Sequence, residues 1–240
     1  IIKRGVPCVV GPQQEAGMDV IEAVAARNGA PLLAYGQQWH VGIEGGRLIY
    51  QDDRGLLDLP RPSLPGDHQV MNAGAALAAL RHLGCDDDAC EAAVRRAYWP
   101  ARMQRLTAGP LIDAAGTAEL WLDGGHNPAA GDAIAQVLAS GPARPTYLIC
   151  GMLNTKDISG FLAPLAPHTA GLFAVSIPGE TNTIPADKTA SIADGVGMSA
   201  HMSDNVAAAI ADIIALAPMA RILICGSLYL AGDVLRQNGG

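Results

Sequence analysis

Three apolar segments of this 240-residue chain end in polar residues that could bind or act on a ligand. They are followed by Asp-Gly-Gly-His-Asn-Pro at 123–128, by a loop at 151–157 that contains Lys156 and Asp157, and by Gly226-Ser227. Asp123 closes its apolar run, where a carboxylate can accept hydrogen bonds from a ribose or hold a substrate ammonium. Ligands of open α/β sheets gather beyond the carboxyl ends of the strands, so these segments predict one shared site.

Each of these residues also has a simpler interpretation, which the local sequence leaves open. His126 precedes Pro128, which suits the first turn of a helix whose free N–H groups can bind an anion. Asp123 and Asn127 could instead only cap the turn, and His126 could be an exposed loop residue. Ser227 could be an ordinary N-cap, and the Lys156-Asp157 pair could be a solvated helix start.

Two further candidates, Asn72 and Arg102, lie outside these segments. Asn72 follows His68 by four residues, so both lie on one face of a predicted helix, and its alanine neighbours predict partial burial. A buried amide needs hydrogen-bond partners, which a nucleotide base could supply. Arg102 lies at a predicted hinge after Trp99-Pro100, where its guanidinium could bind a phosphate or form an interdomain salt bridge.

The elements that must position these residues follow two different patterns along the chain. The first hundred residues predict short strands and helices at 7–10, 15–27, 32–35, 39–43, 47–50, 55–59, 67–82 and 86–98, with Gly45-Gly46 as a hairpin turn. Beyond them strands at 120–123, 147–150, 171–177 and 221–225 alternate with helices at 129–139, 158–165, 186–196, 205–216 and 228–235. Continuous apolar strands that alternate with helices predict a Rossmann-like, mostly parallel sheet covered on both faces.

Composition excludes several classes of function. The net charge is −7 and no Lys/Arg cluster occurs, which argues against a nucleic-acid partner. No apolar run approaches the roughly 18 residues that span a bilayer. The five cysteines show no CxxC spacing and fit a reducing, cytoplasmic compartment, with Cys150 and Cys225 as buried strand residues. No metal-binding spacing of His, Cys and carboxylates is present, and neither GxxxxGK[ST] nor GxGxxG after a strand occurs.

Five segments, in this order, resemble the folate branch of the Mur ligase superfamily, which comprises folylpolyglutamate and dihydrofolate synthases. They are Leu-Pro-Gly-Asp-His-Gln at 64–69 with Asn72, Trp-Pro-Ala-Arg-Met-Gln at 99–104, Leu-Asp-Gly-Gly-His-Asn-Pro at 122–128, Gly-Met-Leu at 151–153 with Lys156-Asp157, and 224–232. The resemblance covers essentially the whole chain. The 151–157 loop and the Gly-Ser-Leu-Tyr-Leu-Ala-Gly run at 226–232 favour this branch over the cell-wall Mur ligases.

The resemblance implies an ATP-dependent ligase that adds L-glutamate to dihydropteroate or folate. ATP would phosphorylate the carboxylate, and the amine of glutamate would attack the acyl phosphate. Asn72 would lie near the base, Arg102 near the phosphates and Asp123 near the ribose, while His126, as the catalytic candidate, and Ser227 would help to hold glutamate. The implied cofactors are ATP and Mg²⁺, and the implied form is a cytoplasmic monomer with small-molecule substrates and neither nucleic-acid nor membrane partners.

The chain departs from the family pattern in what it lacks. The resemblance implies that the phosphate-binding loop, the magnesium ligands and a carbamylated lysine lie upstream of Ile1. Residues 1–103 would then be the tail of an ATPase domain with a small β-subdomain, and residues 104–240 a Rossmann-like glutamate-ligase domain. We therefore expect no turnover from these residues alone, and a non-catalytic binding module remains the alternative. Ala101 stands where many relatives have glycine.

Overall fold

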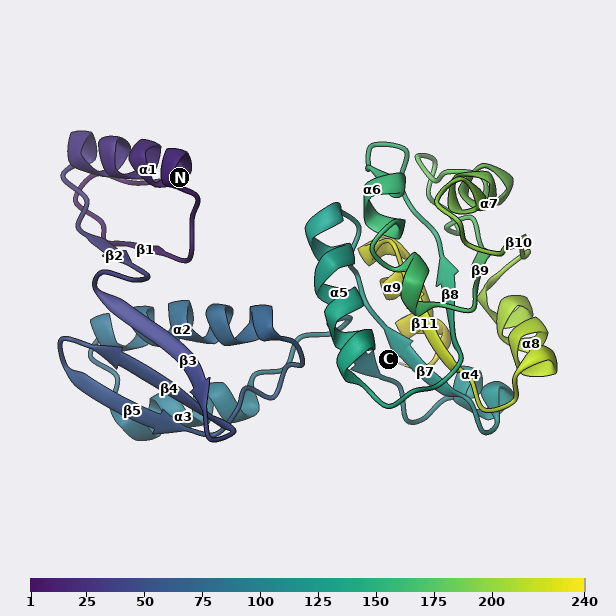
Figure 1. The fold of residues 1–240 in the computed structure, drawn as a ribbon, viewed down its shortest axis with the longest axis horizontal. Helices are drawn as coiled ribbons and strands as arrows, with labels where there is room; N and C mark the ends of the chain where they lie inside the picture. The colour runs from purple at the N-terminus through teal and green to yellow at the C-terminus, as the bar shows by residue number, and fades with distance from the viewer. Residues whose placement is uncertain (240) are drawn as a thin grey trace. The chain divides into compact units, whose positions relative to one another are not determined.

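The computed structural model describes residues 1–239 and separates them into two compact units, Ile1–Tyr98 and Trp99–Gly240 (Figure 1). In the first unit, β1 (Cys8–Val10) and β2 (Leu32–Ala34) pair in parallel and are joined by α1 (Glu15–Asn28). The helix ends at Gly29, whose φ of 57° is the left-handed conformation of a helix C-cap. These elements confirm the predicted strand–helix–strand order.

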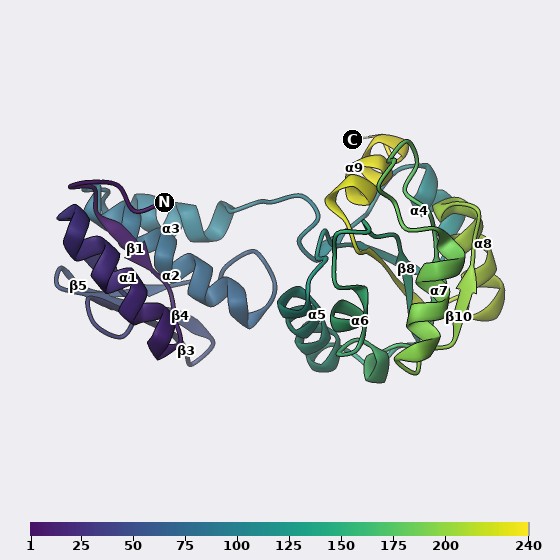
Figure 2. The same cartoon turned by 90° about the horizontal axis from the view of Figure 1, so that it is seen from above.

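The rest of the first unit is an antiparallel sheet with two helices on one face. The sheet contains β3 (Trp39–Glu44), β4 (Arg47–Asp52) and β5 (Gly55–Leu59), and the predicted turn Gly45-Gly46 joins the first two strands with positive φ at both residues. Alternate strand residues such as Trp39 and Tyr50 are buried under α2 (Asp67–His82) and α3 (Asp87–Arg96), which Figure 2 shows together against the sheet. This packing supplies the core of the unit.

The second unit is built on a six-stranded sheet with the strand order β10-β9-β8-β11-β7-β6. All neighbouring strands are parallel except β6, which is antiparallel to β7. The strands are β6 (Gln104–Arg105), β7 (Glu119–Leu122), β8 (Thr146–Cys150), β9 (Gly171–Ala174), β10 (Ala200–Met202) and β11 (Arg221–Cys225). Every residue of β9 and β11 is buried, as expected for parallel strands covered on both faces.

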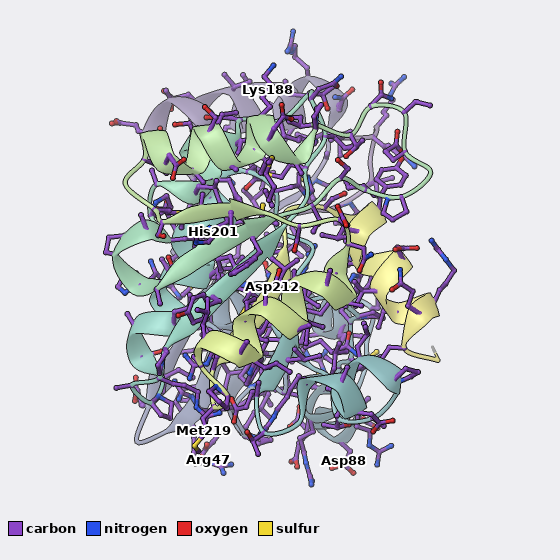
Figure 3. All side chains as sticks on the ribbon, turned by 90° about the vertical axis from the view of Figure 1, so that its right-hand side faces the viewer. Arg47, Asp88, Lys188, His201, Asp212 and Met219 are labelled. Atoms are coloured by element: carbon purple, nitrogen blue, oxygen red, sulfur yellow. The ribbon has the colours of Figure 1, made fainter. Side chains whose placement is uncertain are left out.

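Helices cover both faces of this sheet. One face packs against α4 (Pro110–Ala115), α8 (Val206–Leu216) and α9 (Leu228–Gln237), and the other against α5 (Pro128–Ser140), α6 (Ile158–Leu162) and α7 (Ala186–Gly195). A short 3₁₀ helix, Ala166–His168, follows α6. Figure 3 shows the two layers at the sheet edge, with Lys188 of α7 and Asp212 of α8 on either side of His201 in β10. The three-layer α/β arrangement confirms the predicted Rossmann-like fold class.

Some predicted elements of the second unit were wrong in extent, and others were missed. α6 ends at Leu162 and β9 at Ala174, both earlier than predicted. β6 and β10 have only two and three residues, and neither forms an apolar run because both lie at sheet edges. α4 begins at Pro110, a residue suited to the first helical turn, but its six residues are too short for a clear helical period.

Candidate functional site at the carboxyl ends of the strands

The polar segments predicted to share a site lie together at the carboxyl ends of β7, β11 and β8. Gly226 N donates to Gly125 O at 3.1 Å, and Gly151 N donates to Cys225 O at 3.2 Å. Gly226 has a φ of 104°, and a Cβ built on it would lie 2.8 Å from Gly151 O. Glycine is therefore required where these loops converge, and their predicted convergence is confirmed.

Asp123 is buried directly after β7 and is bonded to two backbone amides. Its Oδ2 accepts from Met103 N at 2.8 Å, and its Oδ1 accepts from Gly125 N at 2.6 Å. The second bond is the turn-capping contact that the sequence left open. The first connects the end of β7 to the segment that contains Arg102. Asp123 is buried, with 6% of the residue exposed.

His126 and Asn127 lie in the loop between β7 and α5. His126 Nδ1 lies 2.8 Å from Gly124 O. A carbonyl can only accept, so Nδ1 carries the proton, and Nε2 of the neutral ring can accept a hydrogen bond from a ligand. Asn127 is the N-cap of α5, because its Oδ1 accepts from Ala130 N at 2.9 Å. Of these two residues, His126 has the side chain available for chemistry.

Ser227 and Asp157 also act as N-caps in this structure. Ser227 Oγ accepts from Tyr229 N at 3.0 Å at the start of α9, and Ser227 is 4% exposed. Its hydroxyl hydrogen can still be donated to a ligand. Asp157 Oδ1 accepts from Gly160 N at 2.8 Å at the start of α6, and Lys156 beside it is exposed. The capping alternatives for these two segments are therefore real contacts.

Arg102 is presented from a segment that packs on the β7 loop. It lies between Ala101 and Met103, and its own side chain is half-buried. The one side-chain hydrogen bond that it forms within the described part of the second unit is from Nη1 to Ala101 O at 3.5 Å, which is long for a hydrogen bond. The guanidinium has no carboxylate partner within the described part of this unit. Arg102 and Asp123 are thus brought to one edge of the sheet.

Cys150 and Cys225 are the last residues of β8 and β11, directly before the loops of this site. They are paired neighbours on β8 and β11 and are 0% and 1% exposed. The hydrogen bond with Cys150 and burial raise the pKa of the Cys225 thiol well above its ordinary value, and electrostatic repulsion from Cys150 and Asp123 adds to this. Both side chains are buried within their strands, which confirms the prediction of small apolar strand residues.

Asn72 lies in the first unit, on α2, and the prediction that it is partly buried was wrong. It is exposed on the helix surface. Its Nδ2 donates to Oε1 of the buried Gln69 at 3.0 Å. Both residues line a cavity of about 180 Å³ whose other walls are apolar, among them Leu64, Leu77 and Val94. A mostly apolar cavity with two amide side chains at its wall suits a heterocycle.

A larger cavity of about 780 Å³ also lies in the first unit, between β3, β4 and the end of α2. Two of its charged side chains, Arg81 and Asp52, are paired with each other. Arg81 Nε lies 2.9 Å from Asp52 Oδ2, Tyr50 donates to the same oxygen at 3.2 Å, and Arg54 N donates to Asp52 Oδ1 at 2.9 Å. Because its buried charges are paired, the cavity wall is a structural network.

Sequence reasoning missed one residue of the site, Gln104. Its Oε1 accepts from Ala101 N at 2.9 Å across the segment that presents Arg102. It belongs to the Trp-Pro-Ala-Arg-Met-Gln motif at 99–104, but nothing in a single sequence distinguishes it from a solvated strand residue.

Among residues 1–239 no group of three or more His, Cys, Asp or Glu side chains could hold a metal ion. None of the helices in this part of the chain combines the length and the apolar character that a membrane span requires.

Comparison with known proteins places this arrangement in a family. Residues 101–228 match the model of the Mur ligase glutamate ligase domain. The chain is 26% identical over 245 residues to folylpolyglutamate synthase of Lacticaseibacillus casei, a match that covers 98% of this chain and 54% of the relative. It is 28% identical over 172 residues to dihydrofolate synthase/folylpolyglutamate synthase of Mycobacterium tuberculosis, covering 66% of this chain and 34% of the relative.

Solved structures agree with the sequence matches. E. coli FolC in complex with DHPP and ADP superposes with a TM-score of 0.82 at 26% identity, covering 98% of this chain and 54% of that one. M. tuberculosis folylpolyglutamate synthase complexed with ADP and AMPPCP gives 0.80 at 26% identity, covering 100% and 57%. The chain thus spans about half the length of the relatives it matches. With more than half of its residues matched by the glutamate ligase domain, the chain belongs to the Mur ligase family, and its relatives there are folylpolyglutamate and dihydrofolate synthases.

Proposed function

We propose that the protein containing this chain is an ATP-dependent ligase that joins L-glutamate to dihydropteroate or a folate through an acyl phosphate. The supporting observation is the cluster of Arg102, Asp123, His126 and Ser227 at one sheet edge of a domain that matches the Mur ligase glutamate ligase family. The relatives are named folylpolyglutamate and dihydrofolate synthases, and solved neighbours are complexed with ADP, AMPPCP or DHPP.

The proposed roles follow from the chemistry each side chain has available. Arg102 would neutralise phosphate charge, since its guanidinium has no carboxylate partner within the described part of its unit. Asp123 would accept from the ribose, since a carboxylate oxygen that accepts from a backbone amide can also accept from a hydroxyl group. Asn72 would meet the base at the cavity of about 180 Å³, its amide being at the wall.

Glutamate is proposed to bind near His126 and Ser227. With Nδ1 protonated against Gly124 O, Nε2 of His126 can accept from the attacking amine and take up its proton, which is the role of a general base. The Ser227 hydroxyl could donate to a glutamate carboxylate while still capping α9. Residues 1–103 are proposed to belong to the family's central ATPase domain and residues 104–240 to its glutamate ligase domain.

Magnesium is part of this proposal, but the described residues give it no binding site. One relative of known structure is complexed with AMPPNP and a manganese ion, which supports a divalent metal in the reaction. Residues 1–239 contain no group of three or more His, Cys, Asp or Glu side chains that could hold the ion, so its ligands are proposed to lie outside them. The proposed compartment is the cytoplasm and the proposed form a monomer, the former supported by the five free thiols.

The test is a ligase assay on the gene product that carries this chain. With dihydropteroate or tetrahydrofolate, ATP and glutamate, we expect ADP release and a product heavier by one glutamate residue. Arg102→Ala should lower kcat/KM by tens- to hundreds-fold, about 2–4 kcal/mol, as expected for a lost charge partner in the transition state. Arg105→Ala is the matched control, since Arg105 is exposed and pairs with Glu119 at 3.1 Å. Equal rates for both variants would remove Arg102 from the site.

A further inference from the structure

The segment that presents Arg102 has an unfavourable backbone conformation. Ala101 has a φ of 54° and Met103 a φ of 41°, the only positive values at residues other than glycine in the described chain. Both residues are buried, at 2% and 5% exposure, and they flank Arg102 on either side. Non-glycine residues adopt this region rarely, and they remain there only where the surrounding contacts hold them.

Hydrogen bonds hold both of these residues. Ala101 N donates to Gln104 Oε1 at 2.9 Å, and Ala101 O accepts from Gly124 N at 2.9 Å. Met103 N donates to Asp123 Oδ2 at 2.8 Å. The three contacts have two sources: the loop after β7, and the side chain of Gln104.

Gln104 is itself fixed by the sheet. It is the first residue of β6 and pairs with Leu122 in the antiparallel register of β6 and β7. The side-chain amide that binds Ala101 N is therefore anchored in a strand rather than in a loop. The residues on either side of Arg102, Ala101 and Met103, are thus both held by hydrogen bonds. Within the described residues of its unit, the Arg102 side chain itself forms only the long hydrogen bond to Ala101 O.

We propose that Gln104 is a positioning residue that fixes Arg102 for phosphate binding by holding Ala101 in its left-handed conformation. The role of Arg102 in this inference rests on the proposed function. The hydrogen bond between Gln104 and Ala101, which we call the clamp, does not. Gln104 acts through Arg102 and touches no substrate. Without its amide oxygen the loop relaxes toward ordinary backbone conformations, and the guanidinium is no longer directed to one place.

A double-mutant cycle on the ligase reaction tests whether Gln104 acts through Arg102. Gln104→Met keeps the volume of the side chain and removes the oxygen, and we expect it to lower kcat about tenfold, as for a side chain that holds a charged group in place. In the Arg102→Ala background the same change should have no further effect. Gln104→Glu retains an acceptor and should restore most of the loss, and Gln136→Ala, on the exposed side of α5, is the control. Equal losses in both backgrounds would overturn the proposal.

Hydrogen exchange of the peptide that spans residues 99–105 tests the clamp without any activity. Gln104→Met should speed exchange at Ala101 and Met103 by more than tenfold, with Gln104→Glu close to the parent, while exchange in β8 and β11 reports that the variant is folded. Unchanged exchange at residues 99–105 overturns the clamp whatever the activity. If Gln104→Met speeds exchange at residues 99–105 but the parent protein never forms the glutamate product, the proposed function is refuted and the clamp is supported.

Discussion

The ion pair between Arg81 and Asp52 provides the clearest test of what holds the first unit together. Their side chains are 3% and 10% exposed, and Arg81 Nε lies 2.9 Å from Asp52 Oδ2. Nε has no acceptor in hydrogen-bond geometry, so this contact is a charge pair rather than an aligned hydrogen bond. Asp52→Ala would leave the guanidinium buried and would also remove the acceptor of the Tyr50 hydroxyl.

The expected loss follows from these contacts. Removing one partner of a buried pair costs about 3–5 kcal/mol. Asp87 lies 3.4 Å from Arg81 Nη1 but is 71% exposed, so it compensates only in part. We therefore expect the lower end of the range, about 3 kcal/mol, in the free energy of unfolding of the first unit.

Urea unfolding followed by the fluorescence of Trp39 measures this loss. Trp39 is 1% exposed in the first unit, and replacing Trp99 and Trp121 by phenylalanine leaves it as the only tryptophan. Asp58→Ala is the matched control, because Asp58 pairs with Arg47 on the same sheet at exposures of 54% and 51%. An exposed pair contributes less than about 1 kcal/mol. Similar losses for the two variants would refute the argument from burial.

Three further predictions concern stability. Asn127→Ala should lower the thermal stability of the second unit by about 1 kcal/mol, because it removes the N-cap of α5. Ala101→Val should lower the free energy of unfolding, measured with urea, by more than about 1 kcal/mol, since β-branched residues avoid a φ of 54°. Ala101→Gly should change this free energy by under about 0.5 kcal/mol. Burial raises the pKa of Tyr50 above its ordinary 10.0 and that of Cys90 above its ordinary 9.0. The unfolded chain thus loses these protons first, and the urea midpoint of the first unit should fall as pH rises through 9 and 10, less so in Tyr50→Phe.

The fold was predictable where side chains repeat with a clear period or where a special residue marks a boundary. The range of α2 was predicted at both ends, since Pro65-Gly66 precedes it and Gly84 follows it. β11 was predicted at both ends because the apolar run 222–225 follows Arg221 directly and ends before Gly226. The edge strand β10 was not, because an edge strand that buries little needs no apolar pattern, and His201 and Met202 are exposed.

The location of the site could be predicted from the sequence, but only some of its hydrogen bonds could. The convergence of three strand ends follows from the geometry of a parallel sheet, so Asp123 and Ser227 could be placed together from their positions in the chain. That both would bond backbone amides could be offered only as an alternative. The role of Gln104 depends on a two-residue antiparallel strand and on φ values at Ala101 and Met103, neither of which leaves a pattern in one sequence.

The two interpretations of Asp123, as a structural cap and as a ribose acceptor, are compatible in this geometry. Its oxygens accept from Met103 N and Gly125 N at 2.8 and 2.6 Å, and a carboxylate oxygen can accept more than one hydrogen bond. A change at Asp123 would therefore disturb both the loop that presents Arg102 and any nucleotide contact, and loss of activity in such a variant could not distinguish them. Gln104 accepts from Ala101 N in the same loop and has no proposed ligand, so its variants disturb the loop without removing a proposed ligand contact. If Gln104→Met leaves the ligase rate intact while Asp123→Asn abolishes it, the carboxylate acts on the ligand and the strained loop is only structural.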